Sequence, residues 1–269
     1  MIDNGYLFAK DDTRIFINTS LGCSGKCLYC YLPKVGYGNK DNNYKTISAN
    51  NVIEMIEQSN YNLNNDTLIT LGCFSECWDK NNKEETLKII EYFLKRGNQI
   101  QLSTKKKISI KELAMLAPYI KYYGQLIIFI STTTISNAII IEKNTESIEK
   151  RFETFEILKN LNIPVILYIK PVLKNITIKD LDLYKRYIKH YNINDVVVGS
   201  IFTNNITDET VHFSNKNELF YTSVEDENTI ISELSKICSV YRRSTEVTNY
   251  YKKKGILQKD IRIKKLMND

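Results

Sequence analysis

The sequence has little histidine and no long apolar run. Its two histidines, His190 and His212, lack the close pairing with further ligands that finger-like zinc sites show. No segment approaches the roughly 20 apolar residues of a membrane helix. The opening MIDNGYLFAKDDTR is acidic and polar, unlike the basic and then apolar start of a secretory signal. We therefore expect a cytoplasmic protein without a membrane partner, in which structural disulfides are uncommon.

The sequence also lacks internal repeats and long linkers. With 269 residues, of which 43% are hydrophobic and 25% charged, it is long enough for one domain with a substantial core. The formal charge is only +6, and lysines gather at residues 105–107 and 250–269. A solvated lysine-rich surface explains these lysines more simply than phosphate binding does. We expect a monomer.

Apolar segments of strand length alternate with amphipathic helical segments as far as residue 200. The predicted strands lie at 14–19, 66–72, 99–104, 125–132, 164–170 and 195–200. The predicted helices lie at 48–60, 83–97, 110–123, 147–162 and 181–192, and Pro118 would interrupt the third. Near-continuous apolar strands separated by helices indicate a parallel sheet that helices cover.

Six strand–helix units are too few for a closed eight-stranded barrel. We therefore predict an α/β fold with a partial (β/α)6 TIM-like barrel over residues 1–202. A C-terminal helical extension follows over residues 203–269, with one amphipathic helix at 227–241 and a lysine-rich tail.

Three of the six cysteines lie in the stretch CSGKCLYCY, at Cys23, Cys27 and Cys30. This stretch follows the first predicted strand, and parallel α/β folds gather their chemistry at the carboxyl ends of the strands. The spacing Cys-x3-Cys-x2-Cys lets three thiolates converge on one metal centre from a single loop. Gly22 and Gly25 supply the backbone freedom that such a loop requires.

A disulfide, a zinc ion and an iron–sulfur cluster are the alternatives for these cysteines. The expected cytoplasmic setting disfavours a disulfide. Zinc would need a fourth ligand, and drawing Cys73 or Cys77 into the site would leave the tight spacing of the first three unexplained. A cubane cluster takes thiolates at such short spacing, and three protein ligands leave one of four irons open. We therefore favour a 4Fe–4S cluster.

Three cluster cysteines in this spacing, after the first strand of a partial barrel, resemble the radical S-adenosylmethionine (SAM) superfamily. The resemblance implies that the open iron binds the amino and carboxylate groups of SAM. One electron then cleaves SAM to methionine and a 5′-deoxyadenosyl radical, which abstracts a hydrogen atom from the substrate. The resemblance also implies a one-electron reductant as partner, such as flavodoxin or ferredoxin.

Further segments resemble one branch of the superfamily, the spore photoproduct lyase (SPL) family. They cover residues 14–202 in order and include LYCYL at 28–32, GCFSECWDK at 72–80, STK at 103–105, FISTTT at 129–134, IEKNTESIEKRFE at 141–153 and IPVILYIKPVLKNIT at 163–177. Residues 203–269, where the family has its lesion-binding part, show no clear match.

The SPL resemblance implies a role for each matching residue. Cys23, Cys27 and Cys30 would hold the cluster. SAM would be contacted by Ser75, Glu76 (where the family usually has aspartate), Lys105, Ser131 and, as weaker candidates, Glu142 and Arg151. Cys73 would return a hydrogen atom to the product radical, with Tyr29 and Tyr31 as a relay. A thiol S–H bond is weak compared with an alkyl C–H bond, so a cysteine at that place could quench a carbon radical.

Alternatives remain for the other cysteines and for the substrate. Cys73 could be a buried small side chain, or it could ligate an auxiliary cluster with Cys77 and Cys238. The SPL resemblance implies a nucleic-acid or nucleotide substrate. A radical SAM epimerase, reductase or lyase that acts on a small metabolite or peptide is the second hypothesis, and a non-catalytic iron–sulfur protein is the third.

Overall fold

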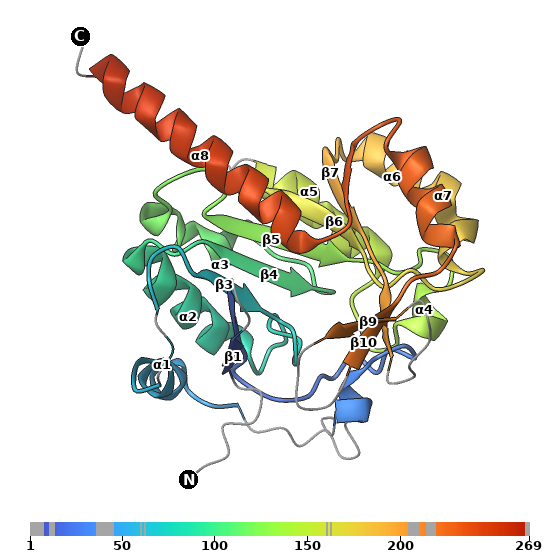
Figure 1. Ribbon diagram of the computed structural model, residues 1–269, viewed down its shortest axis with the longest axis horizontal. Coiled ribbons are helices and arrows are strands. Elements are labelled where there is room, and N and C mark those ends of the chain that lie inside the picture. The colour runs from blue at the N-terminus through green and yellow to red at the C-terminus, as the bar shows by residue number, and fades with distance from the viewer. Residues whose placement is uncertain are drawn as a thin grey trace.

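The computed structural model describes residues 8–10, 14–35, 46–59, 61, 63–159, 161, 163–203, 210–213 and 219–266. Within these residues, the framework is an eight-stranded sheet in the order β1-β2-β3-β4-β5-β6-β7-β11 (Figure 1). The edge strand β1 (Phe8–Lys10) runs antiparallel to its neighbour. The parallel strands are β2 (Arg14–Ile17), β3 (Leu68–Leu71), β4 (Ile100–Thr104), β5 (Leu126–Ser131), β6 (Val165–Ile169), β7 (Asp195–Val198) and β11 (Ser239–Tyr241).

Helices cover the outer face of this sheet. They are α1 (Ala49–Glu57), α2 (Lys83–Arg96), α3 (Ile110–Ala114), α5 (Ile148–Lys159), α6 (Leu181–His190) and α7 (Asp226–Leu234). The short helix α4 (Ala138–Ile141) lies at the carboxyl end of the strands, and 3-10 turns occur at Leu32–Val35, Ala117–Tyr119 and Thr177–Asp180. Their apolar sides bury a continuous core against the strands, in which Ile69, Phe93 and Ile128 are fully enclosed. The predicted partial barrel is confirmed, because all strands of the sheet except β1 are parallel, helices cover it, and it is open.

Local sequence signals determine where α3 begins and ends. Ser109 and Glu112 form a capping box at the start of α3, and Pro118 lies in the 3-10 turn after it, where the sequence predicts an interruption.

None of the described helices has both the length and the apolar character to cross a bilayer.

The predicted helix over residues 227–241 is wrong in its last part. α7 ends at Leu234, and Ser239–Tyr241 form strand β11, which pairs in parallel with β7. Val240 lies opposite Val196, so the strand covers an edge of β7 that would otherwise present unpaired backbone groups. The predicted extension therefore adds a seventh parallel strand to the sheet.

A small antiparallel sheet follows β7 and was not predicted. It consists of β8 (Ile201–Thr203), β10 (Leu219–Thr222) and β9 (Thr210–Phe213), in that spatial order. Because β8 begins three residues after β7 ends, this sheet is attached at the carboxyl end of the barrel strands. Figure 1 shows β9 and β10 beyond the main sheet on that side.

The long helix α8 (Ser244–Leu266) covers the amino ends of the strands on the inner face. Its residues Val247 and Tyr251 pack with Ile127, Ile166 and other inward-facing residues. The Gln99 side-chain amide donates to the carbonyl of Thr248 at 2.8 Å. Beyond this contact α8 extends past the sheet (Figure 1), and the last part of the predicted lysine-rich tail, residues 267–269, lies outside the described residues. Because α8 covers the amino ends of the strands, we expect the functional site at their carboxyl ends.

The packing of α8 gives a stability prediction at Gly124. A Cβ at this position would lie 2.6 Å from Tyr251 Cβ, and its φ of +86° already disfavours other residues. Gly97 has a similar φ of +97°, but its Cβ would meet only the flexible end of Lys121 at 3.8 Å. We expect Gly97→Ala to lower the free energy of unfolding by about 1–2 kcal/mol and Gly124→Ala by about 1–3 kcal/mol more. Equal effects in urea unfolding would contradict the close packing of α8.

Candidate active site

The loop from Gly22 to Tyr31, here called the cluster loop, follows β2 at the carboxyl end of the barrel. Its two sides are fixed to neighbouring segments by the backbone. Gly22 N donates to the carbonyl of Phe74 at 2.9 Å, and Leu28 N donates to the carbonyl of Ile141 at 2.9 Å. The loop therefore joins the segment after β3 to α4. Gly22 has a φ of +109°, which glycine adopts without strain.

The three cysteines of the cluster loop form a group of mutually interacting thiols. The Gly25 amide donates to Cys23 Sγ at 3.3 Å, and Cys27 Sγ lies 3.5 Å from the Gly25 carbonyl. A Cβ at Gly25 would lie 3.2 Å from Cys23 Sγ and 3.9 Å from Cys27 Sγ, so glycine keeps the space beside these sulfurs clear. Burial, followed by the charges of Glu76, Cys30 and Cys27, raises the pKa of Cys23 to about 12, although the Gly25 amide opposes the rise.

The three thiols of the cluster loop are suited to ligate a positively charged metal cluster. Burial also raises the pKa of Cys27 and Cys30, while Lys105 opposes the rise at both. Thiolates at these positions would need a cationic partner, and a bound metal centre supplies one. No three His, Cys, Asp or Glu side chains in the described part of the chain are grouped around a single metal ion. A four-iron cluster is larger than one ion and does not require its ligands to meet at a single point.

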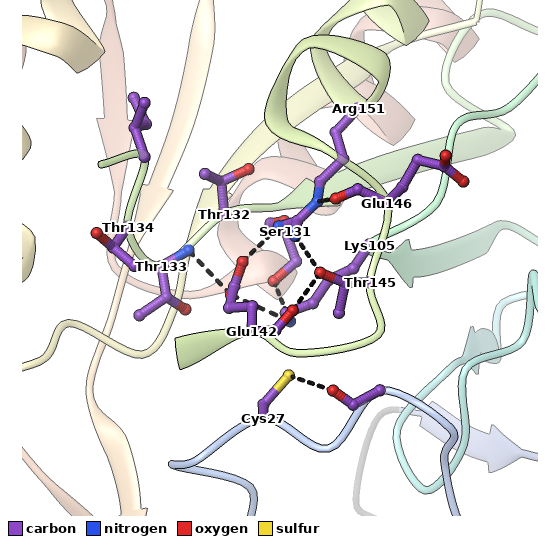
Figure 2. A network of polar contacts seen from close by, with 12 residues as sticks. Cys27, Lys105, Ser131, Thr132, Thr133, Thr134, Glu142, Thr145, Glu146 and Arg151 are labelled. Atoms are coloured by element: carbon purple, nitrogen blue, oxygen red, sulfur yellow. Dashed lines mark hydrogen bonds and ion pairs between the residues drawn. The ribbon is translucent and has the colours of Figure 1, made fainter. Parts of the chain in front are cut away.

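Above the cluster loop lies a buried polar network centred on Glu142 (Figure 2). Arg151 is fully buried, donates to the Glu142 carboxylate, and also donates to the carbonyl of Ser131 at 3.0 Å and to Thr145 Oγ1. Lys105 Nζ donates to Ser131 Oγ at 2.8 Å and lies 3.9 Å from Glu142 Oε1. The network thus joins the ends of β4 and β5 to α4 and α5.

The charge of Glu142 is held by its neighbours. Burial alone would raise the pKa of this carboxyl, but Lys105, Arg151 and the hydrogen bonds from Tyr29 and Arg151 outweigh it and hold the pKa below its usual range. An isolated antiparallel bridge pairs Glu142 with Cys27. The network therefore sets the position of the cluster loop as well as that of Lys105.

Two further residues predicted to contact SAM, Ser75 and Glu76, differ in their surroundings. Ser75 Oγ is buried and has no hydrogen-bond partner among the residues that the structure describes, so its hydroxyl can still donate and accept a hydrogen bond. Glu76 is fully engaged by the protein: Thr104 Oγ1 and Trp78 N donate to one oxygen at 2.5 Å and 3.1 Å, and Lys105 N donates to the other at 3.0 Å. Glu76 therefore positions Lys105, and its role toward SAM stays a prediction.

The predicted hydrogen donor and its tyrosines do not form one group. Tyr31 donates its hydroxyl hydrogen bond to the carbonyl of Cys73 and packs on Phe202 with ring centroids 4.9 Å apart. Tyr29 instead donates to Glu142, while Thr133 Oγ1 donates to the Tyr29 hydroxyl at 2.9 Å. The structure thus brings Tyr31 to Cys73 and places Tyr29 in the Glu142 network. The relay through both tyrosines stays a prediction.

Of the remaining cysteines, Cys238 lies at the opposite end of the sheet from Cys73 and Cys77. Cys77 is buried in the outer core, with Sγ 3.6 Å from the carbonyl of Ser103. Cys238 immediately precedes β11 at the amino end of the sheet. Burial, and to a lesser extent the charge of Asp195, raises the pKa of Cys238 to about 11. Since Cys73 lies at the carboxyl end, the three cysteines are not arranged to share an auxiliary cluster.

Sequence reasoning missed several residues of this site. Thr133 and Thr145 join the Glu142 network, and Lys170 follows β6 directly and approaches the rings of Phe202 and Tyr221. A signal for Lys170 was present, because it is a charged residue at the predicted carboxyl end of a parallel strand.

The family model of the radical SAM superfamily matches residues 17–188, which include the cluster loop and the Glu142 network. The chain belongs to the radical SAM superfamily. Membership implies a 4Fe–4S cluster and SAM as cofactors. No curated protein matches this radical SAM chain in sequence.

Solved structures show the same radical SAM fold. Spore photoproduct lyase complexed with dinucleoside spore photoproduct aligns with a TM-score of 0.60 and 13% identity, over 87% of this chain and 78% of the lyase. A Streptococcus suis SuiB structure bound to S-adenosylmethionine aligns with a TM-score of 0.55 and 9% identity, over 85% of this chain and 50% of SuiB. At these identities the likeness concerns the fold.

Proposed function

We propose that this radical SAM protein is an enzyme that reductively cleaves SAM and acts on a nucleic-acid or nucleotide substrate. The observation that carries the proposal is the meeting, at one end of the barrel, of three cysteine thiols with the Lys105–Ser131–Glu142 network. Cys23, Cys27 and Cys30 would hold a 4Fe–4S cluster. When bound, this cluster supplies the electron that cleaves SAM to methionine and a 5′-deoxyadenosyl radical.

The chain's own residues would bind and orient SAM. Lys105 and Ser131 offer a cation and a hydroxyl at adjacent strand ends, suited to a carboxylate or a ribose. The buried Ser75 hydroxyl offers SAM a further hydrogen bond, since it has no partner in the described part of the chain. Arg151 and Glu142 would support Lys105 and Ser131 without contacting solvent, since both side chains are enclosed and paired with each other.

The partners of this reaction are part of the proposal. A one-electron reductant such as flavodoxin or ferredoxin would deliver the electron, in the cytoplasm, to a monomeric enzyme. The nucleic-acid or nucleotide substrate is supported by the SPL-like motifs and by the structural neighbour that carries dinucleoside spore photoproduct.

Cys73 gives a prediction about the second half of the reaction. We expect Cys73→Ala to retain the iron content and absorbance of the reconstituted wild type while changing the fate of the substrate radical, because the nearby thiol hydrogen is removed. In deuterated water, wild-type product would carry solvent deuterium delivered through the exchangeable thiol, and the variant's product would not. Loss of iron in Cys73→Ala would instead make Cys73 a ligand and contradict the donor role.

Salt dependence tests the substrate class. Binding of a single-stranded oligonucleotide should weaken steeply between about 50 and 200 mM salt, because phosphate contacts release counterions. Product formation from a small metabolite or peptide, together with no binding of oligonucleotides or nucleotides at low salt, would contradict the nucleotide proposal. It would leave SAM cleavage intact.

A further inference from the structure

A cationic and aromatic group lies beside Cys73, on the side of β6 to β8. Lys170 Nζ lies 4.6 Å from the ring centre of Tyr221 and 5.7 Å from that of Phe202. The Phe202 ring is 4.5 Å from Tyr221 and 4.9 Å from Tyr31. We call Lys170, Phe202, Tyr221 and Tyr31 the Lys170 cluster. It reaches Cys73 through Tyr31, which donates to the Cys73 carbonyl.

The Lys170 amine has no anionic partner among the described residues. Within the described part of the chain, the nearby carboxylate that favours its charged form is Glu227, which is not within ion-pair distance and accepts hydrogen bonds from Val224 N and Ser200 Oγ, both at 3.1 Å. The ammonium is therefore left with ring faces as its contacts.

The charged groups near Lys170 act in opposite directions on its charge. Arg14 of β2 and Arg243, which follows β11, both disfavour its charged form, while Glu227 of α7 and Cys73 favour it. Burial is the largest influence and lowers the pKa of Lys170 to about 8. The stem passes over Gly199, where a Cβ would lie 3.0 Å from Lys170 Cδ. Lys170 therefore lies in a buried position without an ion-pair partner among the described residues.

We propose that the Lys170 cluster binds an anionic substrate, with the Lys170 ammonium on its phosphate or carboxylate group and the rings of Phe202 and Tyr221 against its planar part. This inference rests on the proposed function, because it assigns the substrate class of the same site. A flat anionic ligand would supply the missing counter-charge and would lie beside Cys73. Aromatic faces and a cation are the groups that recognise nucleobases and their phosphates.

The test is equilibrium binding to the reconstituted full-length protein with SAM and without reductant. The probes are thymidine 5′-monophosphate against thymidine, and 4-hydroxybenzoate against phenol. At pH 7 we expect an anionic probe to bind about 10- to 100-fold more tightly than its neutral analogue, and Lys170→Met to remove that difference. Which anionic probe binds distinguishes phosphate from carboxylate.

The pH profile separates charge recognition from a structural role. Above pH 8 the wild-type ammonium loses its proton, so probe affinity should fall by up to about tenfold per pH unit. Lys170→Arg should bind at pH 7 and keep its affinity to pH 9.5, because guanidinium stays protonated. Lys174→Gln, in the exposed loop nearby, is the matched control and should bind like the wild type.

Equal binding of anionic and neutral probes, no binding of either anion, or full binding by Lys170→Met with wild-type folding would overturn the assignment. A variant that does not fold is replaced by Lys170→Arg, whose flat pH profile is decisive. No turnover is needed, so these outcomes are distinct from failure of the proposed function, which is absence of 5′-deoxyadenosine from the same wild-type preparation.

Discussion

Replacing Cys27 with alanine is expected to reduce 5′-deoxyadenosine formation from SAM to the level of a protein-free control. Cys27 lies between the other two thiols in the cluster loop and beside the Glu142 network, so its loss removes one of three ligands. The reconstituted variant should also lose the broad visible absorbance and most of the iron of the wild type. The measurement is iron analysis and chromatography of the anaerobic reaction.

Cys238→Ala is the matched control for this prediction. Cys238 contacts the carbonyl of Leu234 at 3.3 Å at the far end of the sheet, so its removal should leave the iron content unchanged. If Cys27→Ala kept its iron while Cys238→Ala lost it, the assignment of the cluster loop would be contradicted.

Arg151→Met should be strongly destabilising. Arg151 and Glu142 are both fully enclosed, and removing the guanidinium leaves a buried carboxylate without its ion-paired hydrogen-bond donor. Breaking a buried pair in this way costs about 3–5 kcal/mol, which corresponds to a fall of roughly 10 °C in the melting temperature. SAM affinity should fall too, because Lys105 and Ser131 lose their support.

Lys150→Met is the control on the same helix. Lys150 pairs with Glu146 at the surface, with 59% of the lysine side chain exposed, so the change should stay within about 0.5 kcal/mol. The loss of stability in Arg151→Met should also depend on pH. The lowered pKa of Glu142 means that the pair stabilises the fold above the unfolded value of about 4.3 and ceases to do so as pH falls through the folded pKa. A constant deficit between pH 7 and pH 3 would contradict a charged pair.

The strands and helices of the barrel could be predicted because their signal is local. Leu68–Leu71 and Leu126–Ser131 are short apolar runs, and α2 carries acidic residues at its start and basic residues at its end. The ends of parallel strands share one edge, which is why the cluster cysteines, Lys105 and Ser131 were expected together.

The elements that were missed depend on tertiary partners. Ser239–Tyr241 is too short to signal a strand by itself, and it forms one only because β7 offers an open edge. The sheet of β8, β9 and β10 is similarly made of very short strands. The sequence places Lys170 at a strand end, but its contacts with the rings of Phe202 and Tyr221 could not be predicted, because a separate small sheet brings these rings to it.

The different surroundings of Tyr29 and Tyr31 were also beyond sequence reasoning. The two residues flank Cys30 and look equivalent, yet the cluster loop directs one to Glu142 and the other to Cys73. Their separation follows from where α4 and the segment after β3 contact the loop.

Reductive cleavage of SAM tests the central claim most directly. The full-length protein, reconstituted anaerobically with iron and sulfide, is incubated with dithionite and SAM, and the products are quantified by mass spectrometry. We expect 5′-deoxyadenosine and methionine in equal amounts, with neither formed when the reductant is omitted. A protein that holds its cluster and forms no 5′-deoxyadenosine, with or without candidate substrates, would contradict it.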